Sequence, residues 1–258
     1  MLMEECIICD NMNTASSIEH IVSESLGNHD YVMKRSKICD DCNQRFSKFE
    51  QKVLSKSILG VERARLGVKT KKGKAAKGEI KELKIEGDTN FKKGNITISG
   101  LNKDNFTGFD PSNKSGQLKI ESFDNSEVAT SRFLLKVGIE GLFTSKRKIF
   151  NKYNFNQLKN YLTNKDNVVW GFIMVDKEHG RFDSIPSYKD KYSLKKINCE
   201  LRFQEKSNNE LLFKFRYGAV SMIINLINRD LEWVQKYKDN EEYVNVFPLH
   251  LDKKIVVL

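Results

Sequence analysis

The sequence lacks the features that mark membrane-bound or exported proteins. No stretch approaches the roughly 18 uninterrupted apolar residues that a membrane-spanning helix needs. The first nine residues carry two acids and no basic group, unlike a secretory signal. The chain also has no internal repeat, Gly-rich phosphate loop, Rossmann fingerprint or heptad array. We therefore expect a soluble cytoplasmic protein without a membrane partner.

Proline is scarce, with 3 residues in 258, whereas apolar residues make up 39% and Phe alone contributes 16 residues. That is enough to build a sizeable core, so the composition is not that of a disordered chain. The length suits one large domain or two small ones. Lys and Arg outnumber Asp and Glu by 44 to 34, and the net charge of +10 favours an anionic partner.

Four of the five cysteines form two CxxC pairs, Cys6 with Cys9 and Cys39 with Cys42. In a chain without an export signal, two such pairs indicate a metal site rather than disulfides. Four thiolates suit a structural zinc ion. Free structural thiols or a redox CxxC are the alternatives, but a redox motif has no use for a second pair. Cys199 stands alone in an alternating apolar segment and is expected to be a core thiol.

The segment between the pairs predicts two short strands followed by a helix. Apolar residues over 18–22 favour a first strand and those over 31–38 a second. A Gly-Asn turn signal lies between them. From Asp40 onward apolar residues recur at helical spacing, and Gly60 is placed to end the helix. One CxxC pair precedes the first strand, and the other lies at the start of the helix.

Three polar residues on this frame have the chemistry of phosphodiester hydrolysis. Glu19 and Asn43 offer hard oxygen ligands suited to Mg²⁺ or Mn²⁺, ions that also take phosphate oxygens. His20, with an ordinary pKa near about 6.5, can take a proton from water at neutral pH. The metal would stabilise charge on the phosphoryl and leaving oxygens.

The segments CIIC, EHIVSESLG and ICDDCN, in this order, resemble the zinc-knuckle branch of the HNH endonuclease family over roughly residues 4–59. The resemblance implies a ββα-metal fold clamped by zinc. It also implies that His20 is the general base and that Glu19 and Asn43 are the ligands of a catalytic Mg²⁺ or Mn²⁺. The implied structural zinc ligands are Cys6, Cys9, Cys39 and Cys42.

Two positions depart from the family pattern. Ser23 stands where the family often has Pro, a change that we expect to be tolerated. The family's middle Asn, which often orients the catalytic His, corresponds to Lys34. Asn28 or a backbone carbonyl would then have to orient His20. Glu50 follows Asn43 by seven residues along one helical face, where an exposed glutamate is the simpler expectation.

The resemblance implies a metal-dependent endonuclease acting on DNA, expected to be double-stranded. Small proteins of this family often serve bacterial restriction or antiviral defence, with a partner protein. A single ββα site cuts one strand at a time, so double-strand cutting would indicate a homodimer or sequential nicks. The alternatives are a purely structural zinc ribbon, an inactive nuclease domain, a non-catalytic nucleic-acid-binding module and a protein-interaction module.

The positive charge is concentrated in one stretch. Residues 1–60 carry 7 basic and 9 acidic residues, whereas residues 61–84 carry 9 and 3. This basic stretch would follow a phosphate backbone beside the acidic unit and give salt-sensitive binding without sequence choice. A solvated linker is the alternative. The candidate nucleic-acid contacts are Lys34, Arg35, Arg45, Lys48, Lys69, Lys71, Lys72, Lys74 and Lys77.

The remaining sequence predicts an α+β domain. Strands are expected within 78–87 and 94–101, a loop over 101–117, an amphipathic helix from near Ser126 and a second helix around Leu158. Further strands are expected over 168–175, 197–203 and 210–218, and segment 219–237 is ambiguous. The predicted organisation is therefore a zinc-knuckle HNH domain (1–60), a basic linker or arm (61–84) and an α+β domain (85–258) that recognises a partner, DNA or a signal.

Overall fold

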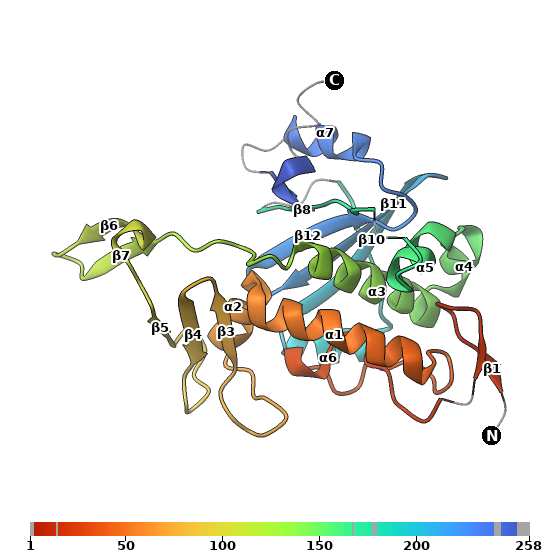
Figure 1. The fold of residues 1–258 in the computed structure, drawn as a ribbon, viewed down its shortest axis with the longest axis horizontal. Coiled ribbons are helices and arrows are strands. Elements are labelled where there is room, and N and C mark those ends of the chain that lie inside the picture. The colour runs from red at the N-terminus through yellow and green to blue at the C-terminus, as the bar shows by residue number, and fades with distance from the viewer. Residues whose placement is uncertain (1–2, 14, 167, 177–179, 240–243, 252–258) are drawn as a thin grey trace.

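The computed structural model describes residues 3–13, 15–166, 168–176, 180–239 and 244–251. The predicted α+β class is confirmed, with an N-terminal unit, a small three-stranded sheet, a projecting hairpin and a six-stranded sheet covered by helices (Figure 1). None of the described helices is both long and apolar enough to cross a membrane.

The N-terminal unit consists of short backbone pairings before one long helix. β1 (Glu4–Glu5) pairs with β2 (Met12–Asn13), and the chain between them holds the first CxxC pair. The two strands predicted next are shorter than expected. They meet as one bridge between His20 and Val32, and the short helix η1 (Glu24–Leu26) lies between them in the chain.

The predicted helix is confirmed as α1 (Asp40–Lys56), but its end was predicted wrongly. Ser57 follows the last residue, and its side chain caps the next helix, α2 (Ile58–Arg65). Gly60 therefore lies inside a helix rather than at an end. A Cβ at this position would lie 2.8 Å from the backbone oxygen of Leu54, so the glycine permits close packing.

The stretch 61–84 contains most of α2, one strand of a small antiparallel sheet and the start of a second strand. This sheet is formed by β3 (Lys77–Ile80), β4 (Leu83–Gly87) and β5 (Ile96–Ser99). Apolar side chains of α2, β3 and β4 form a small core of their own. The lysine-rich loop runs between α2 and β3.

Segment 101–117 was expected to be a loop but contains regular structure. It holds η2 (Lys103–Asn105) and most of the hairpin of β6 (Phe106–Asp110) and β7 (Ser115–Leu118), which projects from the body in Figure 1. Phe106 and Leu118 are both exposed, which accounts for the loop-like composition of this segment.

Helix α3 (Glu127–Ser145) begins directly after Ser126, as predicted, and leads into the C-terminal region. α4 (Arg147–Lys152) and α5 (Asn156–Leu162) follow it. The larger sheet has the order β13-β8-β12-β11-β10-β9 and is antiparallel throughout. Its strands are β8 (Phe172–Met174), β9 (Asp183–Ser184), β10 (Cys199–Ser207), β11 (Glu210–Tyr217), β12 (Val220–Asn225) and β13 (Asn245–Phe247). The other helices are α6 (Tyr188–Lys196), α7 (Glu232–Lys238) and η3 (Leu249–Leu251).

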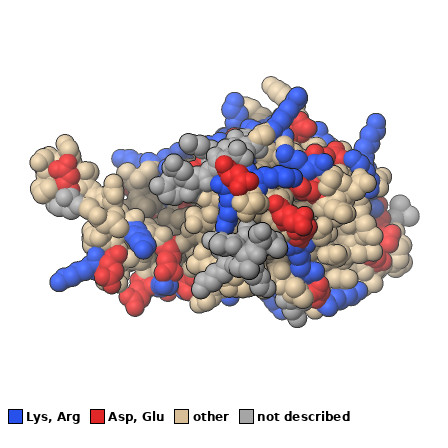
Figure 2. All heavy atoms as spheres, turned by 90° about the horizontal axis from the view of Figure 1, so that it is seen from above, with Lys and Arg blue, Asp and Glu red and all other residues tan. Residues whose placement is uncertain are grey.

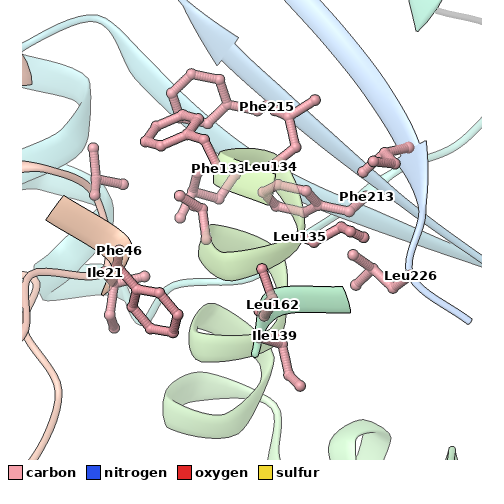
Figure 3. Close-up of a cluster of buried hydrophobic side chains, with 14 of the residues drawn as sticks. Ile21, Phe46, Phe133, Leu134, Leu135, Ile139, Leu162, Phe213, Phe215 and Leu226 are labelled. Atoms are coloured by element: carbon pink, nitrogen blue, oxygen red, sulfur yellow. The ribbon is translucent and has the colours of Figure 1, made fainter. Parts of the chain in front are cut away.

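One hydrophobic core joins the N-terminal unit to the C-terminal region through α3. Residues 127–145 of this helix lie beside α1 on one side and pack on the sheet on the other. Figure 3 shows Ile21 and Phe46 from the N-terminal unit near α3, with Phe213 and Phe215 of β11 beyond it. Each Å² of apolar surface that this shared core removes from water contributes roughly 25 cal/mol to the free energy of folding. The N-terminal unit therefore shares its core with the C-terminal region.

A buried acid makes a second junction between the two parts. Glu62 of α2 is 4% exposed, and its Oε1 accepts hydrogen bonds from Ala219 N at 2.6 Å and from Arg65 Nη2 at 2.5 Å. Gly218 has φ +58°, and a Cβ there would collide with Oε1 of Glu62. This turn between β11 and β12 thus depends on a glycine to accept the carboxylate.

Candidate functional site

The two CxxC pairs come together as one cluster. The four Sγ atoms of Cys6, Cys9, Cys39 and Cys42 all lie within 4.8 Å of one another, and Cys9 and Cys39 are 3.6 Å apart. In a tetrahedral zinc site with Zn–S bonds of about 2.3 Å, the sulfurs are about 3.8 Å apart. Among the described residues, this is the one set of three or more His, Cys, Asp or Glu side chains that converges in this way. The donor set and its spacing fit zinc.

The surroundings of the thiols also favour a cation. All four are free, and three of them are buried. Hydrogen bonding with the sulfur of Cys42 lowers the pKa of Cys6 to about 4, whereas burial raises the pKa of Cys9 to about 11. The neighbouring Cys6 sulfur raises the pKa of Cys42 as well. Four thiolates at this separation repel one another unless a metal ion balances their charge.

A pocket beside this cluster contains the three residues predicted to carry out the chemistry. Its volume is about 470 Å³, and Glu19, His20 and Asn43 all line it. Asn43 Nδ2 donates a hydrogen bond to Ser17 Oγ at 3.0 Å, which fixes the amide plane. That bond uses the nitrogen, so Oδ1 is the atom of the amide suited to a cation.

His20 is half-buried at one side of this pocket. Burial lowers the pKa of its imidazole below 6.5, Glu24 opposes this shift, and Lys71 adds to it. The side chain is therefore neutral at physiological pH. Its backbone is fixed by the bridge to Val32.

The side chains of Lys34 and Asn28, the candidate orienting residue, both bind groups other than the imidazole of His20. Lys34, at the position of the family's middle Asn, is exposed and pairs with Glu4 at 3.1 Å. Asn28 is buried, and its Nδ2 donates to Val22 O at 2.7 Å and to Tyr31 O at 2.9 Å. Asn28 therefore holds the turn between the two paired segments.

Glu19 is joined to a lysine that the sequence motifs did not identify. Lys136 of α3 is 0% exposed, and its Nζ forms ion pairs with Glu19 Oε1, with Glu50 Oε1 at 3.1 Å and with Glu140 Oε2 at 3.2 Å. The same nitrogen donates to His20 O at 2.6 Å. The ammonium of Lys136 thus binds both the side chain of Glu19 and the backbone of its neighbour His20, the predicted general base.

The buried cluster of Lys136, Glu19, Glu50 and Glu140 has more acids than bases. Burial would lower the pKa of Lys136, but its three carboxylate neighbours raise it well above its ordinary value, so it stays charged. Burial raises the pKa of Glu19 and, more strongly, that of Glu140. Lys136 Nζ approaches Oε2 of Glu140 at 3.2 Å, whereas Oε1 of Glu140 has no hydrogen-bond partner among the described residues. The excess of acid is an electrostatic cost that a bound cation would relieve.

The nine basic candidates divide by position. Lys71 lines the pocket and pairs with Glu24 at 2.7 Å. Lys77 pairs with Glu86 at 2.8 Å, on β3. Arg45 is half-buried, and the other exposed candidates besides Lys34 are Arg35, Lys48, Lys69, Lys72 and Lys74. On the face in Figure 2, basic and acidic side chains are interspersed, so that face carries no field of a single sign.

Sequence reasoning undervalued Glu50 and missed Lys136 and Glu140. Glu50 was expected to be exposed to solvent, but it is half-buried and lines the pocket. Lys136 and Glu140 are charges at i and i+4 within the otherwise apolar stretch 133–143 of α3. That spacing was a usable signal, because a charged pair on a buried helix face needs partners.

Comparison with known proteins identifies the N-terminal unit alone. Residues 6–59 match the family model described as HNH endonuclease, so this unit is an HNH-family domain with a cysteine cluster that can hold zinc. The matched segment includes Glu19, His20, Asn43 and Glu50 but ends well before Lys136. No curated protein and no solved structure matches the chain.

Replacement of one cluster thiol tests the zinc site. Cys39→Ser is expected to abolish stoichiometric zinc and to lower the melting temperature, because a structural zinc site contributes directly to folding. Zinc per chain is measured by atomic emission. The control is Cys199→Ala, which removes a buried thiol of β10 that lies outside the cluster. Equal zinc in Cys39→Ser and the wild type would rule out this site.

The pH dependence of stability tests the buried Glu140. Its pKa is raised in the folded state, so folding holds a proton that the unfolded chain releases, and stability falls as pH rises above about 4.5. Lys136, Glu19 and Glu50 are the charged groups that act on it. Glu140→Gln removes this titration. The free energy of unfolding of Glu140→Gln minus that of wild type should therefore increase from pH 5 to pH 8, by at most about 1.4 kcal/mol per pH unit.

Urea denaturation at the two pH values measures this difference. The exposed Glu82→Gln serves as the control, with a difference from wild type that stays constant between pH 5 and pH 8. A constant difference for Glu140→Gln as well would show that the folded protein does not raise the pKa of Glu140.

Proposed function

We propose that the protein is a metal-dependent endonuclease that hydrolyses phosphodiester bonds in DNA, with double-stranded DNA as its substrate. One observation carries the proposal: Glu19, His20 and Asn43 line one pocket of an HNH-family domain, beside a cysteine cluster that fits zinc. A zinc ribbon alone has no reason to bring a carboxylate, an imidazole and an amide to one pocket.

The oxygen donors of the pocket suit Mg²⁺ or Mn²⁺. Glu19 and Asn43 are the proposed ligands, and one or two protein oxygens suffice because such ions keep several waters and bind substrate phosphates. The ion pair with Lys136 uses Oε1 of Glu19, so Oε2 is the proposed ligand atom. A divalent ion there would stabilise negative charge on the phosphoryl and leaving oxygens.

His20 is the proposed general base. Its ring lies at a pocket and is not fully buried, so water reaches it, and a neutral imidazole can accept a proton from that water. Lys136 is the proposed positioning residue. It binds the carbonyl oxygen of His20 and one oxygen of Glu19, and so fixes the separation of the base from the metal ligand.

The basic side chains around the unit are proposed to hold the DNA backbone. Because Glu19, Glu24 and Glu50 all line the pocket, phosphates would be repelled without neighbouring cations. Lys71 is the basic candidate at the pocket itself, and the other eight would bind more distant phosphates and give affinity without sequence choice. A role in bacterial restriction or antiviral defence, with a partner protein or as a homodimer, rests on the family resemblance.

One observation favours a second candidate, a non-catalytic nucleic-acid-binding or interaction module. The ammonium of Lys136 already neutralises one oxygen of Glu19, the proposed metal ligand. In a non-catalytic module the zinc-bound unit and the lysines would suffice for nucleic-acid binding, and loss of His20 would leave that binding unchanged.

A supercoiled-plasmid assay separates the two candidates. Wild-type protein should produce nicked circles in Mg²⁺ or Mn²⁺ and none in EDTA. His20→Ala should nick about 10²- to 10⁴-fold more slowly with unchanged zinc content, because it removes the base. The matched control is His250→Ala, which removes an exposed histidine of η3. Absence of nicking by zinc-loaded wild type on duplex, single-stranded DNA and RNA would overturn the proposal.

A further inference from the structure

A second pocket adjoins the first and is formed by four separate parts of the chain. Its volume is about 860 Å³, within the range of ligand-binding sites. Its walls are the turn 24–30, the loop 66–73 with Lys93, and the end of α6. It shares Glu24 and Lys71 with the pocket that contains His20. The two pockets are therefore continuous along one surface.

The cations of this second pocket outnumber its acids. Lys69, Lys71, Lys93 and Lys196 line it, together with Glu24 and Asp30. Glu24 is paired with Lys71, and Asp30 accepts a hydrogen bond from Ser193 Oγ at 3.2 Å. Lys69, Lys93 and Lys196 have no carboxylate within ion-pair distance among the residues that the structure describes; Lys69 lies 4.5 Å over the ring of Phe91. Three cations are thus left for an external anion.

The walls of this pocket are held by packed contacts. Gly27 has φ +90°, and a Cβ there would lie 3.1 Å from Ile197 Cγ2, so the turn lies directly against the end of α6. Tyr217 Oη donates to Leu26 O at 3.0 Å, which ties the same turn to β11. The loop after α2 is closed by the bridge between Lys69 and Ala75. In Figure 1 this loop and the loop after β4 lie on the same lower side of the molecule as α6.

We propose that this basic groove, defined by Lys69, Lys71, Lys93 and Lys196, binds the sugar-phosphate backbone of the DNA strand next to the phosphate that is cut. The inference deepens the proposed function, on which it rests. Cations supplied from separate loops and a helix suit a chain of phosphates better than one small anion. It also gives the chain beyond the HNH-family match a role, because all four lysines lie outside residues 6–59 and Lys196 belongs to α6 of the C-terminal region.

Binding measured without cleavage tests the groove. The protein is the zinc-loaded full chain carrying His20→Ala, and the probe is a fluorescein-labelled DNA duplex of mixed sequence without added Mg²⁺ or Mn²⁺, followed by fluorescence anisotropy from 50 to 200 mM KCl. Lys93→Gln with Lys196→Gln should weaken binding and reduce the slope of log K against log salt by about 2, because each lysine accounts for about 0.9 of that slope.

The matched control is Lys148→Gln with Lys165→Gln. These two lysines are also exposed and also lack a carboxylate within ion-pair distance among the described residues. Lys148 lies in α4 and Lys165 follows α5 by three residues; both helices are at the right of Figure 1, whereas α6 and the loop after α2 are at its lower centre. The control pair removes the same charge and should change the slope by less than about 0.5. An equal effect of both pairs, or no binding by the parent protein, would overturn the groove.

Cleavage distinguishes this failure from failure of the proposed function. The pair Lys93→Gln and Lys196→Gln is introduced into protein that keeps His20, and its nicking rate is compared with that of wild type. An unchanged rate would overturn the groove and leave the proposed endonuclease activity intact. Salt-sensitive binding that depends on the groove pair, without nicking by the wild type in either metal, would overturn the endonuclease and support the groove as a nucleic-acid site.

Discussion

The ammonium of Lys136 is the interaction on which the arrangement of this molecule depends. It is fully buried and bound to carboxylates from three parts of the chain, Glu19, Glu50 of α1 and Glu140 of its own helix. Loss of the one ammonium from this buried cluster leaves carboxylates uncompensated, and an uncompensated buried charge typically costs about 3–5 kcal/mol. Helix α3 therefore cannot leave the N-terminal unit without exposing this imbalance.

The family-matched segment is consequently not a self-contained module. Its apolar side chains Ile21 and Phe46 belong to the same core as α3 and the six-stranded sheet. Glu62 ties α2 to the turn before β12 by accepting a hydrogen bond from Ala219 N. Charge and packing thus both join the two parts. The ammonium of Lys136 in α3 binds the backbone oxygen of His20, which lines the pocket.

Local patterns predicted much of the fold. The cysteine spacing gave the quartet, helical periodicity gave α1 and α3, and apolar alternation gave β10 and β11. Gly60 was misplaced because its role is close packing between segments, which composition does not reveal. The hairpin of β6 and β7 was missed because it is solvated and has little apolar alternation.

The pocket was only partly predictable for a related reason. Glu19, His20 and Asn43 lie within one motif, so their convergence follows from a resemblance over a short segment. Lys136 lies far along the chain from that motif and reaches Glu19 only through tertiary packing.

The most direct measurement is the plasmid nicking rate of Lys136→Met, with Lys148→Met as its control, and the Mg²⁺ concentration for half-maximal rate of each. Both are measured at a temperature where circular dichroism shows the two variants to be folded. A positioning role for Lys136 predicts that Lys136→Met alone nicks about 10- to 100-fold more slowly or needs a higher Mg²⁺ concentration for half-maximal rate. Equal rates and equal Mg²⁺ requirements would contradict it.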